Sequence, residues 1–217
     1  KELVEYKWLF EKSFNKNHFL IIGTNTQVLE DGSIDYFNSF SIYDHNLSLL
    51  NSYNKINLVP FGEFLPFENV LKFFGLRSIT NNYQPFSRGN KREIIEIKKG
   101  NFSLKILPLI CYEMIYSGKI FKKSNFDLII NISEDGWFGN SVGPEQHFIH
   151  SVFRAVESGK YILRSANNGV AAVINPLGVT EQKIEFGKSG YVEFNEARKI
   201  QPTAFSKYGN KIFIMLI

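Results

Sequence analysis

The chain has 217 residues, of which 44% are hydrophobic and 21% are charged. This length and composition suffice for a sizeable packed core and exclude an intrinsically disordered chain. A single cysteine excludes a disulfide scaffold and leaves one free thiol as a candidate nucleophile. The net charge of +4 comes from acidic and basic residues mixed along the chain, so nucleic acid is not an expected partner.

The two ends of the sequence carry separate signals. No stretch reaches the roughly 20 apolar residues needed to cross a bilayer, and residues 1–10 lack the order of a signal peptide. The chain starts at Lys1 and stops within an apolar run that begins at Ile212. We expect residues 212–217 to be either a last core strand or the start of a longer hydrophobic segment, and we interpret the chain as a fragment.

Short β-rich runs alternate with helix-like segments, which predicts one layered α/β or α+β domain over residues 1–211. Helices are expected at 1–16, 67–75, 113–123 and 144–159. Strands are expected at 19–23, 37–43, 47–53, 94–97, 102–110, 128–132, 161–165 and 170–174. Because strands and helices alternate, we expect the chemistry to lie where strands end.

Cys111 lies where an apolar strand meets the following helix. Backbone N–H groups and the helix dipole favour a thiolate over a thiol at such a position. The alternative is a buried structural cysteine. Glu113, two residues further on, favours the functional interpretation because a carboxylate beside a strand-end thiol is a poor choice for packing alone.

Residues 55–67 read KINLVPFGEFLPF, and the prolines and glycine predict a shaped loop. Lys55 and Glu63 place two charges in a largely apolar stretch, where an unpaired charge is costly. A buried lysine can face a developing oxyanion or act as a general acid. The alternatives are a solvated lysine at a strand end and a carboxylate next to a helix cap.

Residues 131–143 read NISEDGWFGNSVG, a loop with two aromatic side chains, Trp137 and Phe138, between glycines. Such a loop commonly binds a ligand or a membrane, although its aromatics can also fold back over the core. We expect His147 and His150 on the polar side of the next helix, facing solvent. No cluster has the spacing of metal ligands, and a Cys–His dyad is not indicated.

The turn at 167–169, Asn-Asn-Gly, is expected to need left-handed backbone angles. Arg164 precedes it on a predicted strand. We expect this arginine to be buried and paired, with a partner that the sequence does not identify.

Five blocks of sequence together resemble the nitrilase-like domain of bacterial apolipoprotein N-acyltransferases. They are KINLVPFGEFLP at 55–66, FSRG at 86–89, ICYE at 110–113, NISEDGWFGNSVGPEQHF at 131–148 and LRSANNGV at 163–170. The blocks span most of the chain in the order found in that family. The wider nitrilase superfamily shares only a Glu, a Lys and a Cys with looser surroundings.

The resemblance implies a nitrilase-like αββα sandwich. It also implies an enzyme that takes an acyl chain from a phospholipid and holds it as a cysteine thioester. The chain is then passed to the α-amino group of a lipidated N-terminal cysteine. The implied site consists of the nucleophile Cys111, the triad lysine Lys55, the further carboxylates Glu63 and Glu113, the pocket residue Tyr112, and the substrate-contacting lid residues Trp137 and Phe138.

The implied partners are a phospholipid acyl donor, a lipidated apolipoprotein acceptor and a membrane surface. The implied protein is a monomer without cofactor or metal, in the bacterial inner membrane with this domain on the periplasmic side. The family's general-base glutamate precedes the first strand in a Trp-Pro-Glu-like context, which Glu2, Glu5 and Glu11 lack. We therefore expect the base and its strand to be missing from this chain, and a C-terminal membrane helix to be at most begun at Ile212.

Two other interpretations stay open. The first is a soluble carbon-nitrogen hydrolase that sends the thioester to water, for which the aromatic loop and the apolar end would be unnecessary. The second is an inactive remnant with most of the site residues but no base.

Overall fold

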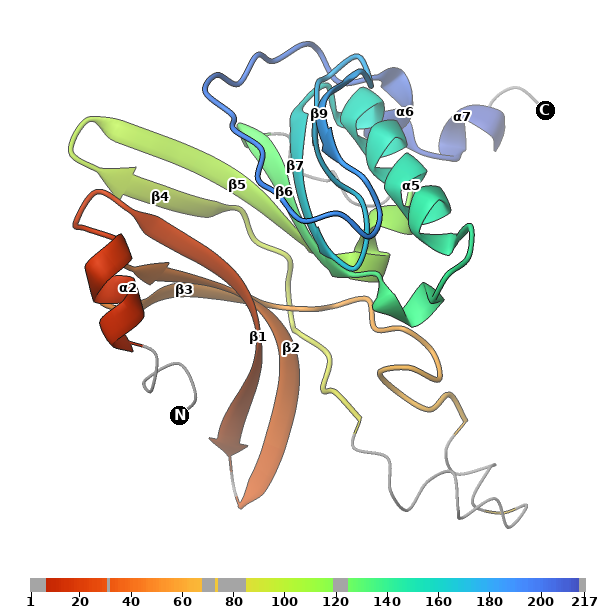
Figure 1. The fold of residues 1–217 in the computed structure, drawn as a ribbon. Coiled ribbons are helices and arrows are strands. Elements are labelled where there is room, and N and C mark those ends of the chain that lie inside the picture. Colours follow the sequence, from red (N-terminus) through yellow and green to blue (C-terminus); the bar gives the residue numbers. More distant parts are fainter. Residues whose placement is uncertain (1–6, 31, 68–72, 74–84, 119–124, 215–217) are drawn as a thin grey trace. The chain divides into compact units, whose positions relative to one another are not determined.

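The computed structural model describes residues 7–30, 32–67, 73, 85–118 and 125–214. The chain divides into two compact units, Lys1–Arg92 and Glu93–Ile217, which we describe one at a time (Figure 1). In the described residues, no helix has the length and hydropathy needed to span a membrane.

The first unit is built on a three-stranded antiparallel sheet in the order β1-β2-β3. It begins with α2 (Lys7–Ser13), followed by β1 (Phe19–Glu30), β2 (Ser33–Asp44) and β3 (Leu49–Asn54). The expected hairpin at 37–53 is confirmed, and its turn is closed by Asp44, whose Oδ1 accepts the N–H groups of Asn46 and Ser48. The first strand is longer than the expected 19–23.

The second unit contains a six-stranded sheet in the order β4-β5-β6-β7-β8-β9. Its elements are β4 (Ile95–Lys99), β5 (Phe102–Ile110), η1 (Cys111–Ile115), β6 (Leu128–Glu134), η2 (Gly136–Phe138), α5 (Gly143–Ser158), β7 (Tyr161–Asn167), β8 (Ala171–Ile174), β9 (Thr180–Ile184), α6 (Ala204–Tyr208) and α7 (Lys211–Ile214). The neighbours β5, β6 and β7 are parallel, and the other pairs are antiparallel.

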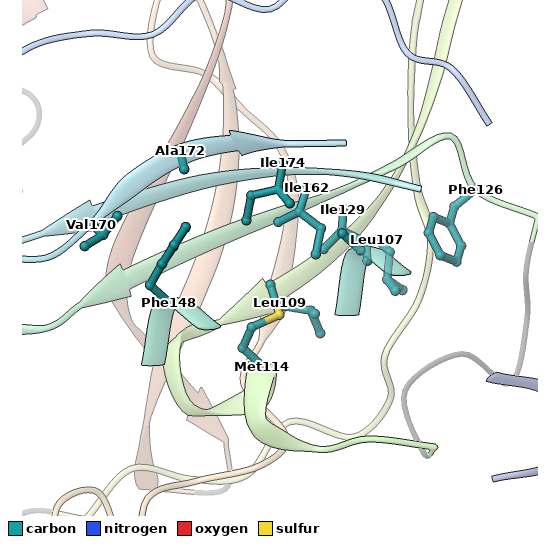
Figure 2. Close-up of a cluster of buried hydrophobic side chains, with 11 residues drawn as sticks. Leu107, Leu109, Met114, Phe126, Ile129, Phe148, Ile162, Val170, Ala172 and Ile174 are labelled. Carbon is teal, nitrogen blue, oxygen red and sulfur yellow. The ribbon is translucent and has the colours of Figure 1, made fainter. Parts of the chain in front are cut away.

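The core of the second unit lies between this sheet and the elements that follow β5 and β6 (Figure 2). Leu107, Leu109 and Ile129 from the central strands pack with Met114 of η1 and Phe148 of α5. Central parallel strands are buried on both faces, which explains why β5 and β6 read as nearly continuous apolar runs.

One expected helix differs from the structure. The helix expected at 113–123 is instead the short 3₁₀ helix η1, which begins at Cys111 and ends at Ile115. Tyr116 is extended, and Gly118 has a φ of 66°, so the helical path stops there. Residues 119–124 lie outside the described residues, as does the expected helix at 67–75 apart from Phe67 and Phe73.

Candidate active site

The carboxyl ends of three parallel strands lie at one edge of the six-stranded sheet. β5 ends at Ile110, which pairs with Ile132, and Glu134 at the end of β6 pairs with Asn167 at the end of β7. This edge is where α/β folds place their ligands and reacting groups, in agreement with the expected location of the chemistry.

Cys111 is the first residue after β5 and the first residue of η1. Its φ is 46°, a left-handed conformation that a residue with a side chain adopts only at a cost of about 1–3 kcal/mol. The thiol is partly exposed. The structure therefore places the single cysteine on a sharp, strained turn between a buried strand and a short 3₁₀ helix.

Glu113 is fully buried in η1, and its Oε2 accepts the backbone N–H of Ile110 at 3.0 Å. This bond closes the turn that carries Cys111. Tyr112 lies next to Cys111 in the chain, and its ring and that of Tyr116 meet edge to face with centroids 5.5 Å apart.

Lys55 and Glu63 form a buried ion pair in the first unit. The Lys55 side chain is 1% exposed, and its Nζ lies 2.8 Å from both carboxylate oxygens of Glu63. Asn38 Nδ2 and the backbone N–H of Val59 donate to the same carboxylate, each at 2.8 Å. A solvated Lys55 is therefore ruled out: the lysine is a desolvated cation with a fixed partner.

Gly89 in the FSRG block holds the backbone beside this lysine. Its N–H donates to the Lys55 carbonyl at 2.9 Å. A Cβ at this position would lie 2.1 Å from the Asn54 carbonyl oxygen, so only glycine allows the two segments to approach this closely.

Trp137 and Phe138 occupy the short helix η2 and differ in their exposure. Trp137 is 77% exposed, whereas Phe138 is 42% exposed and its ring lies 5.6 Å from the imidazole of His147. A Cβ on Gly143 would come within 2.5 Å of the Phe138 ring. Phe138 thus packs against the start of α5 and leaves Trp137 as the projecting side chain of the loop.

The expectation that His147 faces solvent is wrong. His147 is 4% exposed, and its Nδ1 lies 2.8 Å from Asp135 Oδ1 while its Nε2 lies 3.1 Å from the Cys111 carbonyl oxygen. His150, by contrast, is half-buried. The face of α5 turned to the protein carries the residues Pro144, His147, Phe148, Ser151, Arg154, Ala155 and Ser158. Their i, i+3, i+4, i+7 spacing is the signal that could have identified His147 as buried.

The partner of Arg164 is Asp135, which follows β6. Arg164 Nη2 donates to Asp135 Oδ2 at 2.6 Å, and both side chains are fully buried. Burial alone raises the pKa of Asp135, but the hydrogen bond from His147 and the charge of Arg164 outweigh it, so the pKa lies below the usual 3.8. Asn168 has the expected left-handed conformation, with a φ of 49°.

Ligand-type atoms of Cys111, Asp135 and His147 lie within 4.8 Å of one another, a spacing that a metal ion could also use. Asp135 Oδ1 and His147 Nδ1 are hydrogen-bonded to each other, and the second carboxylate oxygen binds the guanidinium of Arg164. The ligand-type atoms of Asp135 and His147 are thus engaged in hydrogen bonds, and the Arg164 guanidinium lies beside them. We therefore describe the group as a hydrogen-bonded cluster.

The family model of carbon-nitrogen hydrolases matches residues 4–192. The chain belongs to the carbon-nitrogen hydrolase family. Its fold is similar to that of an amidase from Nesterenkonia sp. AN1 with acrylamide added at the active site cysteine, at a TM-score of 0.52 and 13% identity over 84% of this chain and 64% of that chain. It is also similar to a glutamine-dependent NAD⁺ synthetase from Acinetobacter baumannii, at a TM-score of 0.58 and 19% identity over 86% of this chain and 32% of that chain. These likenesses confirm the expected α/β fold of the nitrilase superfamily.

Two curated relatives are named apolipoprotein N-acyltransferase. The protein from Rickettsia prowazekii is 37% identical over 204 residues, which cover 93% of this chain and 40% of the relative. The protein from Bradyrhizobium diazoefficiens is 37% identical over 175 residues, which cover 80% of this chain and 32% of the relative. The chain thus spans two fifths or less of the length of these relatives.

Proposed function

We propose that this chain carries the cysteine nucleophile and the triad lysine of an apolipoprotein N-acyltransferase, with the general-base glutamate outside it. The protein would transfer a fatty acyl chain from a phospholipid, through a thioester on Cys111, to the α-amino group of an N-terminal diacylglyceryl-cysteine. The observation that carries the proposal is a single cysteine on a strained strand-end turn, in a chain 37% identical to acyltransferases of that name.

The chemistry proceeds in two acyl transfers. The Cys111 thiolate attacks the ester carbonyl, the C–O bond breaks, and the lysophospholipid leaves with a proton. The free amine of the acceptor then attacks the thioester, the C–S bond breaks, and an amide forms as the thiol recovers its proton. In this proposal Lys55 supplies the positive charge for the oxyanion, and Glu63 fixes that lysine, since its carboxylate holds Nζ on both oxygens.

The remaining assignments belong to the same proposal. Glu113 closes the turn of the nucleophile, Tyr112 contacts the acyl chain beside it, and Trp137 and Phe138 form a lid at the bilayer surface. An exposed indole supports this role because amphipathic aromatic rings favour the membrane interface. The protein would act as a monomer in the bacterial inner membrane, with residues 1–211 as a catalytic domain on the periplasmic side and 212–217 as the start of a membrane helix.

A carbon-nitrogen hydrolase that passes the acyl group to water is the second candidate. The likeness in fold to a cysteine amidase favours it. The two functions differ in the final acceptor: an amine for the acyltransferase, water for the hydrolase.

The test uses the protein expressed from its complete reading frame and reconstituted in phospholipid vesicles with a diacylated lipopeptide. Mass spectrometry should detect one added acyl chain as an amide on the lipopeptide N-terminus, and Cys111→Ala should abolish it. Release of free fatty acid or of ammonia from small amides, with no acylated lipopeptide, would identify a hydrolase instead.

A further inference from the structure

A buried chain of hydrogen bonds joins four elements of the second unit and ends on the backbone of Cys111. It begins at Arg164 in β7, which is 2% exposed. The guanidinium donates from Nε to the Val170 carbonyl at 3.0 Å, from Nη1 to the side chain of Asn131, and from Nη2 to Asp135 Oδ2 at 2.6 Å. Three N–H groups of the arginine are thereby used in hydrogen bonds. The guanidinium is therefore held in a fixed position beside Asp135.

Asp135 links Arg164 to His147 of α5, because its carboxylate is hydrogen-bonded to both side chains. Its Oδ1 accepts Ser133 Oγ at 2.6 Å and faces His147 Nδ1 at 2.8 Å. The carboxylate therefore has charged or polar partners on both oxygens, and the imidazole is held in one orientation.

His147 has an acceptor group beside each of its two ring nitrogens. Nδ1 faces a carboxylate and Nε2 faces the carbonyl of Cys111, and both of these groups can only accept. Both contacts are hydrogen bonds only when both ring nitrogens carry a proton. The 3.2 Å approach of Arg164 Nη2 to His147 Nδ1 is then a contact of two donors that share Asp135 as acceptor.

We propose that His147 is a positioning residue for Cys111: a buried imidazolium, held by Asp135 and Arg164, that fixes the nucleophile's backbone carbonyl. A residue with a φ of 46° stays in place only when its surroundings determine its conformation. The bond from Nε2 reaches the carbonyl of that same residue at 3.1 Å. His147 therefore acts on the direction of the thiol through the main chain.

The cluster also has a net positive charge. Arg164 and His147 contribute two positive charges and Asp135 one negative charge, and His147 and Asp135 lie within 4.8 Å of the Cys111 sulfur. His150 on the same helix also interacts electrostatically with His147. The sulfur of Cys111 therefore lies beside a group of side chains with a net positive charge.

The first experiment measures alkylation of Cys111 by iodoacetamide near neutral pH in the protein expressed from its complete reading frame. Any alkylation at this residue is read directly from the mass of its peptide. His147→Leu removes the donor and should slow alkylation at least about tenfold. His147→Gln keeps a donor for the carbonyl and should recover part of the rate. His150→Gln, three residues along the same helix, should match the parent.

A parent-like alkylation rate in folded His147→Leu would overturn the proposal. So would an alkylation rate of His147→Gln that is no higher than that of His147→Leu. Should the leucine variant fail to fold, nitrogen-15 NMR of histidine-labelled parent protein decides. Near pH 7.5 the resonances that His147→Gln removes should show both ring nitrogens protonated, whereas a neutral ring with one N–H would contradict the proposal. The inference rests on the proposed function only in taking Cys111 as nucleophile. Alkylation needs no acyl donor, so its outcome and that of the lipopeptide assay are independent.

Discussion

Lys55 makes two contacts to the carboxylate of Glu63 in an otherwise apolar stretch. Its replacement by methionine removes the proposed oxyanion cation and should lower the rate of Cys111 acylation by about 100-fold or more. The same change leaves a buried carboxylate without its cation, which costs about 3–5 kcal/mol of unfolding free energy.

The double variant Lys55→Met/Glu63→Gln separates these two effects of removing Lys55. It has no buried unpaired charge, so it should recover stability but not acylation. Single-turnover acylation and chemical denaturation measure the two quantities. Lys98→Ala, at an exposed lysine, is the control. Wild-type acylation by the folded double variant would exclude Lys55 from the chemistry.

Trp137 is the most exposed aromatic side chain of its loop, at 77%, so its truncation removes little packing. Trp137→Ala should leave the melting temperature nearly unchanged and should weaken turnover of long-chain phospholipid more than that of a short, soluble thioester. Leu177→Ala, at a residue 71% exposed on another loop, should affect neither donor. Equal losses of turnover with both donors after Trp137→Ala would argue for a packing role of the tryptophan.

Helix α5 ends at Gly159, which has a φ of 63° and donates its N–H to the Ala155 carbonyl. A Cβ here would lie 2.6 Å from the Ile200 carbonyl and 2.9 Å from that of Gln201. Gly159→Ala should therefore destabilise the protein by about 1–3 kcal/mol in denaturant unfolding. Gly190→Ala is the control, since its nearest contact would be an ordinary 3.5 Å. Equal stability of the two variants would contradict this account of the cap.

His150 on the same helix links stability to pH. Burial, followed by the charges of Arg154 and His147, lowers its pKa below 6.5. Between the folded pKa and 6.5 the unfolded chain binds more protons, so the free energy of unfolding falls as pH falls through this window. The parent should lose more unfolding free energy between about pH 7 and 5 than His150→Gln. Identical losses would show that His150 titrates alike in both states.

The sequence predicted α5 as a helix, but not the polar residues on its buried face. Three apolar side chains of this helix are partly exposed, namely Val156 at 40%, Ile149 at 44% and Phe153 at 57%. Beside Phe148 and Ala155, the buried face carries polar side chains such as His147 and Arg154. Hydrophobic periodicity locates a helix and assigns its apolar residues to the buried face. It does not identify polar residues on that face, which are buried where they contribute to a site.

At the scale of the whole molecule, the strands of the second unit were largely predictable because buried parallel strands are apolar runs bounded by turns. The second half of β1, which reads TNTQVLE at 24–30, has polar residues on a partly exposed strand and no such signal. Lys55, Glu63 and Cys111 were identified as candidates because charges and a thiol stand out beside apolar segments. The hydrogen-bonded cluster of Arg164, Asp135 and His147 was not predicted. Its members lie apart in sequence and meet only when β5, β6 and β7 align.

The measurement that tests the central claim most directly is the mass of the Cys111 peptide after the protein, expressed from its complete reading frame, meets a phospholipid donor without acceptor. We predict an added acyl chain that hydroxylamine removes and that Cys111→Ala lacks, because in this account the Cys111 sulfur forms the thioester. Normal turnover by Cys111→Ala, or an acyl chain found only on another residue, would contradict the account.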